Sequence, residues 1–251
     1  MERITSLKNP KVQLWKSLKD RKGRRETGCF MAEGRKMVEE ALASAFPVEA
    51  LLVDEARLAE FTLPADVPLY ALPENVLAAV CDTKTPQGIA AVVKISSTAA
   101  PGRKVVALDG VQDPGNVGTI IRTADAAGLE GIILSEQCAD VFSPKTLRAT
   151  MGSVFRMPIV VTGDLPGCLT GLRQEGYSVI SSQLDGEPFY QRRPVGEKFC
   201  LIIGNEGNGI SDEVKATATH KVKLPMRGGA ESLNAAIAAG IMMYDLMKDC
   251  E

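Results

Sequence analysis

The sequence predicts an α/β protein in which a small N-terminal α/β domain precedes a larger domain built on a mostly parallel sheet with helices on both faces. After residue 103, short apolar runs alternate with helical patterns. These runs are almost continuously apolar, which is typical of parallel strands that are covered on both sides. With 251 residues, 45% of them apolar, the chain can bury one large core or two modest ones.

The first 95 residues are expected to form the small domain. Asn9 and Pro10 are typical of a helix start, with Asn as the cap and Pro in the first turn. The basic segment Asp20–Gly28 is expected to be a loop, and Gly34 is expected to open a helix that ends before Pro47. Two further helical patterns cover residues 55–60 and 73–80. The expected strands cover residues 29–32, 49–53, 68–71 and 89–95.

Residues 96–103 are small and polar, contain Pro and Gly, and form the expected linker. Residues 104–251 then make up the second domain. Its expected strands cover residues 104–108, 131–134, 158–161, 177–181, 199–203 and 220–224. Its expected helices lie near residues 117–127, 143–151, 164–175 and 211–217. Ligands of such sheets bind beyond the carboxyl ends of the strands.

A long helix is expected near the C-terminus, within residues 224–246. A loop broken by Pro and Gly leads into it, and Ser232 stands where the N-cap is expected. Apolar residues recur at helical spacing, namely Leu233, Ile237, Ile241 and Tyr244. The simplest interpretation is a buried helix. Its first two turns, residues 235–240, carry small side chains, which let another backbone or a ligand approach closely.

Composition excludes several kinds of chemistry. The chain has one histidine, and its six cysteines include no CxxC pair, so neither a histidine base nor a zinc site is expected. The scattered cysteines are interpreted as reduced thiols of a cytoplasmic protein. No apolar run approaches the ~18 residues of a membrane helix, and the first residues have no apolar core of a secretory signal. We therefore expect neither a membrane anchor nor a metal.

Positive charge is concentrated at the N-terminus. Residues 1–36 hold eleven Lys and Arg against four Asp and Glu, although the whole chain has a net charge of −2. A basic arm on an acidic body suggests contacts with phosphate groups. The candidate RNA contacts are Arg21, Lys22, Arg24 and Arg25 in this arm, with Lys145, Arg148 and Arg156 farther along the chain. The alternative is that these residues form ordinary solvated faces.

Three segments that follow expected strands carry the candidate chemistry. They read LDGVQDPGNVGTIIRTADAAG (108–128), LIIGNEGNGIS (201–211) and LPMRGGAESLNAAIAAG (224–240). The second is neither a dinucleotide fingerprint nor a P-loop. Their polar residues are Asn116, Arg122, Glu206, Ser232 and Asn234. They offer neither a nucleophile–histidine pair nor a pair of carboxylates, so they suit a reaction based on positioning, polarisation and a bound cofactor. Simple helix capping is the alternative for Asn116 and Ser232, and loop ordering for Glu206.

Together the three segments resemble the signature motifs of the SpoU-type, TrmH-like RNA ribose 2′-O-methyltransferases of the SPOUT superfamily. The resemblance covers residues 104–249 and extends more loosely to the N-terminal part, which is similar to a ribosomal-protein-like substrate-binding domain. It implies a deep trefoil knot, a homodimer and bound S-adenosylmethionine. The positions that match cofactor contacts are Gly204, Leu224 and Leu233, with Ile203, Asn205 and Met226 beside them.

The resemblance implies methyl transfer from S-adenosylmethionine to a ribose 2′-hydroxyl of structured RNA, with rRNA favoured over tRNA. It implies that Arg122 activates the hydroxyl; an arginine is hard to deprotonate, so we expect it to stabilise the developing alkoxide. Asn116 and Asn234 would orient Arg122 and the ribose, Glu206 would hold the glycine loop or pair with Arg122, and Ser232 would cap the helix or contact the ligands. The alternatives are a catalytically silent knotted RNA-binding protein and a base or tRNA-position methyltransferase of the knotted superfamily.

Overall fold

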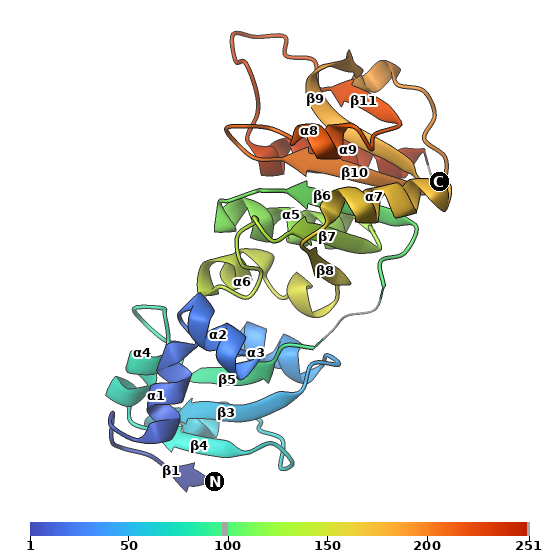
Figure 1. Ribbon diagram of the computed structural model, residues 1–251. Coiled ribbons are helices and arrows are strands. Elements are labelled where there is room, and N and C mark those ends of the chain that lie inside the picture. Colours follow the sequence, from blue (N-terminus) through green and yellow to red (C-terminus); the bar gives the residue numbers. More distant parts are fainter. Residues whose placement is uncertain (97–99, 250–251) are drawn as a thin grey trace. The chain divides into compact units, whose positions relative to one another are not determined.

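The computed structural model describes residues 1–96 and 100–249. Part of the expected linker, residues 97–99, and Cys250 therefore lie outside the described residues. The contacts divide the chain into two compact units (Figure 1). The first unit combines Met1–Ser96 with Asp140–Phe155, and the second combines Ser97–Ala139 with Arg156–Glu251. The sequence analysis placed residues 140–155 in the second domain, but their contacts lie with the first unit.

The first unit is built on a mixed five-stranded sheet of order β1-β4-β3-β5-β2. The strands are β1 (Glu2–Arg3), β2 (Cys29–Glu33), β3 (Val48–Asp54), β4 (Leu69–Leu72) and β5 (Ile89–Lys94). The helices are α1 (Pro10–Ser17), α2 (Arg21–Thr27), α3 (Arg35–Leu42), α4 (Glu74–Val80) and α6 (Pro144–Thr150), with 3-10 turns at η1 (Glu55–Glu60) and η2 (Ser153–Phe155). The predicted helix start at Asn9 is confirmed, since its side chain accepts a hydrogen bond from the Lys11 N–H.

Aromatic side chains attach the inserted segment to the first unit. The rings of Phe30 and Phe142 lie 4.8 Å apart, and those of Phe46 and Phe155 lie 5.5 Å apart. Phe30 is fully buried and also lies 6.0 Å from Phe155. Because two rings of this cluster come from residues 140–155, the core of the first unit is assembled from two separate stretches of chain.

The expected loop at Asp20–Gly28 is wrong, because residues 21–27 form helix α2. Gly28 closes this helix in the left-handed conformation, as glycine commonly does after a helix. A Cβ on Gly23 would lie 2.1 Å from the Ser17 carbonyl oxygen, so only glycine allows the close packing of α2 on the end of α1. A glycine within a run of charged residues is typical of a loop, so the sequence pattern did not indicate this helix.

The second unit contains a six-stranded sheet of order β11-β9-β10-β6-β7-β8, in which all described pairs are parallel (Figure 1). The predicted parallel sheet is thus confirmed. Its strands are β6 (Lys104–Asp109), β7 (Gly131–Ser135), β8 (Ile159–Thr162), β9 (Ser178–Pro188), β10 (Phe199–Gly204) and β11 (His220–Lys223). Its helices are α5 (Pro114–Ala127), α7 (Leu165–Gln174), α8 (Asp212–Lys215) and α9 (Ala235–Lys248), with a 3-10 turn η3 (Phe189–Gln191).

Helices cover both faces of this sheet. On one face, Val105 and Ala107 of β6 share a core with Leu169 of α7 and Val214 of α8. The apolar residues of β6 that alternate with these two point to the opposite face of the sheet and are also fully buried. Helices α5 and α9 pack together on this opposite face. This burial on both faces explains why the strands read as continuous apolar runs.

Two expected helix caps are displaced. Asp113, not Asn116, caps α5 through a 2.9 Å hydrogen bond from the Asn116 N–H, and Pro114 occupies the first turn. Asn234, not Ser232, caps α9 and accepts hydrogen bonds from the Ala236 and Ile237 N–H groups. The side chain of Asn116 is therefore free for contacts outside its own helix.

The apolar residues that recur at helical spacing in the C-terminal helix do not form its buried face. Leu233 is 39% exposed, Ile237 54%, Ile241 38% and Tyr244 52%. The buried residues of α9 are Ala236, Ala239, Met242, Met243 and Leu246. A Cβ on Gly240 would lie 3.5 Å from Thr123 Cγ2, so the small residues allow α9 to pack closely on α5 of the same chain.

Candidate active site at the carboxyl ends of the parallel strands

Three segments far apart in the sequence meet through one chain of side-chain hydrogen bonds. Asn116 Nδ2 donates to Glu206 Oε1 at 2.9 Å, and Asn234 Nδ2 donates to Asn116 Oδ1 at 2.9 Å. These residues lie in the first turn of α5, in the loop after β10 and at the start of α9. The grouping expected from the sequence is therefore present for these three residues.

Glu206 also holds the chain that leads into α5. Its carboxylate accepts hydrogen bonds from the backbone N–H groups of Gln112, at 3.2 Å, and Asp113, at 3.3 Å. Partial burial of Glu206 acts to raise its pKa, but the hydrogen bonds from Asn116 and from the backbone outweigh it, so the net pKa is below the usual value. The carboxylate is thus ionised at neutral pH and accepts these three hydrogen bonds rather than a proton.

Arg122 and Ser232 stand apart from this network. Arg122 is exposed on α5 and makes no hydrogen bond to the described residues; in particular it does not pair with Glu206. Ser232 is exposed in the loop before α9 and likewise has no hydrogen-bond partner within the described part of the chain. Both polar groups remain available to ligands.

The loop after β10 is a tight hairpin. Asn205 and Gly209 exchange backbone hydrogen bonds of 2.9 and 3.0 Å, and the Asn205 side chain accepts from the Gly207 and Asn208 N–H groups. Its amide also donates to the Gly110 carbonyl at 2.8 Å. A Cβ on Gly204 would lie 2.3 Å from the Gly209 carbonyl carbon, so this glycine is needed by the hairpin itself. The side chain of Asn205 is fully engaged within the chain.

The segment between β11 and α9 has the chemistry of a cofactor wall. Within the described residues, the main chain of residues 225–232 makes no hydrogen bond, so its N–H and C=O groups can serve a ligand. Leu224 and Met226 are half-buried, and Ile203 at the end of β10 is 3% exposed. Apolar side chains and backbone groups of this kind are typical of small-molecule binding sites.

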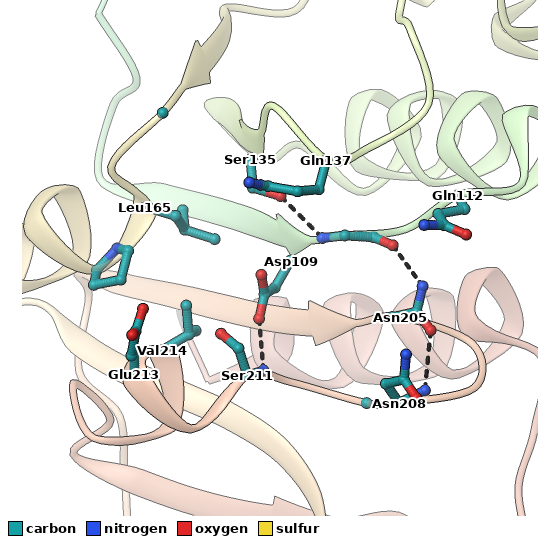
Figure 2. A pocket seen from close by; sticks show the side chains of 14 residues that line it. Asp109, Gln112, Ser135, Gln137, Leu165, Asn205, Asn208, Ser211, Glu213 and Val214 are labelled. Carbon is teal, nitrogen blue, oxygen red and sulfur yellow. Dashed lines mark hydrogen bonds between the residues drawn. The ribbon is translucent and has the colours of Figure 1, made fainter.

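A pocket of about 380 Å³ opens beside this hairpin, at the ends of β6, β7, β8 and β10 (Figure 2). Figure 2 shows Asp109, Ser135 and Asn205 around it; Ser135 accepts from the Gly110 N–H at 3.0 Å and Asp109 from the Ser211 N–H at 2.7 Å. Gln112 connects the pocket with the hydrogen-bond network, because its side chain lines the pocket and its backbone donates to Glu206.

Of the residues expected to form the site, only Asn205 lines this pocket. The polar lining that sequence reasoning missed consists of Asp109, Gln112, Ser135, Gln137, Asn208, Ser211 and Glu213. Their position directly after strands was the available signal, since side chains at the carboxyl ends of parallel strands gather at one edge. Among the described residues there is no cluster of three His, Cys, Asp or Glu side chains able to hold a metal ion. None of the described helices is long and apolar enough to span a membrane.

The expected RNA contacts differ in their surroundings. Arg24 is corrected: it is 4% exposed, pairs with Asp140 at 2.6 Å and donates to the Leu18 and Lys19 carbonyls, so its guanidinium is used inside the first unit.

The other six residues that were expected to contact RNA are exposed. Arg21 and Arg25 are exposed on α2, and Lys22 forms only a 3.8 Å surface pair with Glu26. Arg148 pairs with Asp82 at 2.8 Å, and Arg156 pairs with Asp125 at 2.7 Å. Lys145 is exposed on α6. Surface pairs of this kind are weak and exchange readily for phosphate.

Comparison with known proteins agrees with the fold. Residues 103–244 match the SpoU rRNA Methylase family, and residues 9–91 match the MRM3-like substrate binding domain. The chain is 44% identical to the 23S rRNA (guanosine(2553)-2'-O)-methyltransferase RlmP of Bacillus subtilis, over 98% of this chain and 99% of that protein. It is 35% identical to an uncharacterized tRNA/rRNA methyltransferase of Synechocystis, over 96% and 92% of the two chains.

Solved structures show the same architecture. An AdoMet-bound rRNA methyltransferase from Sinorhizobium meliloti has a TM-score of 0.88 and 35% identity, over 98% of this chain and 97% of that chain. The SpoU methyltransferase AviRb from Streptomyces viridochromogenes, in complex with AdoMet, has a TM-score of 0.84 and 28% identity, over 96% and 98%. The fold and the site define an RNA methyltransferase with a substrate-binding domain. The chain belongs to the SpoU rRNA methylase family.

Proposed function

We propose that this protein transfers a methyl group from S-adenosylmethionine to a ribose 2′-hydroxyl of 23S rRNA. The observation that carries the proposal is the hydrogen-bonded chain Glu206–Asn116–Asn234, which brings the three family segments to one place. The relative from Bacillus subtilis is named for this reaction on a guanosine of 23S rRNA, and it matches over nearly the whole chain. Transfer RNA is the second candidate substrate, and a catalytically silent RNA-binding protein is the alternative function.

When bound, S-adenosylmethionine supplies an electrophilic methyl group on a sulfonium. We assign its binding to the ends of β10 and β11 and to the start of α9, through Ile203, Gly204, Leu224, Met226 and Leu233. The backbone groups of residues 225–232, which make no hydrogen bond to other described residues, support this assignment. Asn205 contributes through its backbone position only, because its side chain is used to close the hairpin.

Arg122 is assigned the role of stabilising the attacking oxygen. The guanidinium stays protonated in proteins, so it is a poor proton acceptor but an effective partner for a developing alkoxide and for a phosphate. Its exposure, and its freedom from hydrogen bonds within the described residues, support this role. Asn116 and Asn234 position the ribose, and Ser232 offers a hydroxyl to the ligands.

Glu206 is assigned a positioning role. Its carboxylate already accepts from Asn116 and from two backbone N–H groups, and these bonds lower its pKa. A carboxylate with a lowered pKa is a weak base, so it is better suited to fix the geometry of Asn116 than to remove the hydroxyl proton.

RNA is held in this proposal by both units. Arg21, Lys22 and Arg25 on α2, together with Lys145, Arg148 and Arg156, provide exposed positive charge for the phosphate backbone. Binding of this kind should weaken steeply with added salt. The first unit matches a substrate-binding domain, which supports its use as the RNA-recognition part.

A homodimer is proposed on the basis of α9. Leu233, Ile237, Ile241 and Tyr244 form one exposed apolar stripe at helical spacing, and such a stripe on a helix normally packs against a partner. The start of the same helix carries Asn234, so a second copy seated here would border the site.

We also propose that the chain is knotted in its second unit. We further propose that the protein acts in the cytoplasm, in line with the five described cysteines, which are all free thiols.

The proposal is tested in two steps. Titration calorimetry with S-adenosylmethionine should show binding by the purified protein. Ribose methylation is then mapped in 23S rRNA from cells with and without the gene. One 2′-O-methyl group should be absent from the RNA of cells that lack the gene. It should return when that RNA is incubated with the purified protein. Binding of S-adenosylmethionine without any methyl group transferred would favour a silent RNA-binding protein, and loss of a tRNA methyl group would move the substrate to tRNA.

A further inference from the structure

The first unit contains a cavity of about 280 Å³ that the methyl-transfer site does not use. Its floor is apolar, with Met37, Cys81 and Ile89 each at most 8% exposed. Burial raises the pKa of Cys81 to about 12, so its thiol stays neutral and belongs to the apolar surface. Pro86 and Met151 add further apolar surface. The volume is at the lower end for ligand pockets and suits a single heterocycle rather than a whole nucleotide.

The walls of this cavity are fixed before any ligand binds. Glu33 accepts hydrogen bonds from the Asp82 N–H at 2.7 Å, from the Thr83 N–H at 3.0 Å and from the Thr83 hydroxyl. Gln87 Oε1 accepts from the Arg35 N–H at 3.1 Å. The start of α3 and the loop before β5 are thereby held together, and both carboxylate oxygens of Glu33 accept hydrogen bonds from the loop.

Met151 is held at the cavity in a strained backbone. It is the one non-glycine residue with a positive φ in the described part of the chain, at φ 51° and ψ 34°. It ends α6 at a position where glycine is the usual residue. Its side chain nevertheless remains 42% exposed and lines the cavity. Strain of this kind is often retained where a side chain serves a function.

Two basic side chains line the cavity beside its apolar floor, together with the carboxylate of Glu33. Lys36 is exposed at the first turn of α3, and Arg148 lies one turn before Met151 on α6. Arg148 pairs with Asp82 at 2.8 Å, but both side chains are about two-fifths exposed, so this pair exchanges readily for another anion. An apolar slot beside two cations has the chemistry of a site for an unstacked base and its adjoining phosphates.

We propose that this cavity binds one flipped-out base of the RNA substrate, with Lys36 and Arg148 on the neighbouring phosphates and Met151 against the base. The inference rests on the proposed function, because it takes the ligand to be the RNA that is methylated. The base is a recognition element distinct from the methylated nucleotide. The site is made by α3, the loop 81–89 and α6, so the inserted segment 140–155 takes part in reading the RNA.

Steady-state kinetics on a 23S rRNA transcript test the proposal. Met151→Gly removes the side chain and relieves the strained backbone, so the protein should be as heat-stable as the wild type or more so. The KM for RNA should nevertheless rise about tenfold, with kcat and the affinity for S-adenosylmethionine unchanged. Lys36→Glu should raise the KM similarly, whereas Lys94→Glu, an exposed lysine of β5 away from the cavity, should not. Unchanged KM values in both cavity variants overturn the inference.

Photocrosslinking gives a second, independent measurement. A benzophenone amino acid at position 151 should crosslink to one nucleotide of the transcript, mapped as a reverse-transcription stop, and the same group at the exposed position of Leu14 should not label that nucleotide. The wild type should bind a transcript that is abasic at this nucleotide about tenfold more weakly than it binds the intact transcript. Met151→Gly should bind the abasic and the intact transcript equally well. Scattered or absent crosslinks contradict the inference. A wild-type protein that methylates no RNA would instead contradict the proposed function.

Discussion

Asn116 Nδ2 donates a 2.9 Å hydrogen bond to Glu206 Oε1, although the two residues are ninety positions apart. Asn116 lies in the first turn of α5 and Glu206 in the hairpin after β10, so the bond joins the ends of two adjacent strands, β6 and β10. Because Asn234 donates to the same Asn116, the orientation of one amide is fixed from both sides. The site is thus ordered by the chain itself.

Substitution of Glu206 should show a characteristic pH dependence. The folded state lowers the pKa of Glu206, so the carboxylate contributes stability above the unfolded pKa of about 4.3, and this contribution is lost as the pH falls through the lowered pKa. Glu206→Gln should therefore reduce the free energy of unfolding at pH 7 by less than about 1 kcal/mol, since the side chain is exposed and screened. The reduction should shrink at pH 4.

Urea unfolding of both proteins at the two pH values measures this difference. Glu213→Gln is the matched control, because Glu213 is exposed and accepts no hydrogen bond within the described residues. An equal loss of stability at pH 7 and pH 4 would show that the charge of Glu206 is not involved.

Replacement of Arg122 should separate chemistry from cofactor binding. If the guanidinium stabilises the developing alkoxide, Arg122→Ala should lower kcat by about 100-fold or more while the Kd for S-adenosylmethionine stays the same. Arg122→Lys keeps the charge but not the planar fork, so it should recover only part of the rate. Single-turnover methylation and calorimetry measure the two quantities. Arg173→Ala, an exposed arginine of α7, should behave as wild type; near-normal methylation by Arg122→Ala would remove Arg122 from the mechanism.

The exposed stripe on α9 makes the oligomeric state testable. Ile237 is 54% exposed at its centre, so Ile237→Glu places a charge on the stripe without disturbing the core of the chain. We expect the wild type to sediment as a dimer and Ile237→Glu as a monomer, because burial of an unpaired charge opposes association. Methylation should fall with the dimer. Val161→Glu, at an exposed residue of β8, is the control; if Ile237→Glu sediments as a dimer, the stripe is not the interface.

The positions of the strands along the chain and the polar residues of the site could be predicted from the sequence, because both depend on local patterns. Apolar runs indicated the strands β6 to β11, and Asn116, Glu206 and Asn234 follow strands of this set. The caps were misplaced by two or three residues, since Asn116 and Ser232 are as suitable chemically as Asp113 and Asn234. Only the three-dimensional contacts decide which of them caps.

Other features depend on long-range contacts that a sequence pattern does not contain. The stripe at Leu233, Ile237 and Ile241 has the spacing of a buried face, but the core of α9 is made by Ala239 and its neighbours, which pack on α5. The membership of residues 140–155 in the first unit depends on Phe142 and Phe155 reaching Phe30, across more than a hundred positions. Nothing in the local pattern indicates either partner.

Arg24 and Arg25 are neighbours in the sequence and should differ completely in their roles. Arg24 is buried and pairs with Asp140 at 2.6 Å, so Arg24→Ala leaves a partly buried carboxylate and two carbonyls without their partner. The free energy of unfolding should fall by about 3–5 kcal/mol. Arg25 is exposed, and Arg25→Ala should change stability by less than about 0.5 kcal/mol.

For RNA binding, Arg25→Ala should have the larger effect and Arg24→Ala the smaller one. If α2 contacts the phosphate backbone, Arg25→Ala should weaken binding of a 23S rRNA transcript and reduce the slope of log K against log salt by about 1, because one phosphate contact is lost. At a temperature where it stays folded, Arg24→Ala should keep the wild-type slope, since its guanidinium is turned inward. Thermal unfolding and filter binding at several salt concentrations measure both effects. A reduced slope for Arg24→Ala, or an unchanged slope for Arg25→Ala, would contradict the assignment of the exposed face of α2 to RNA.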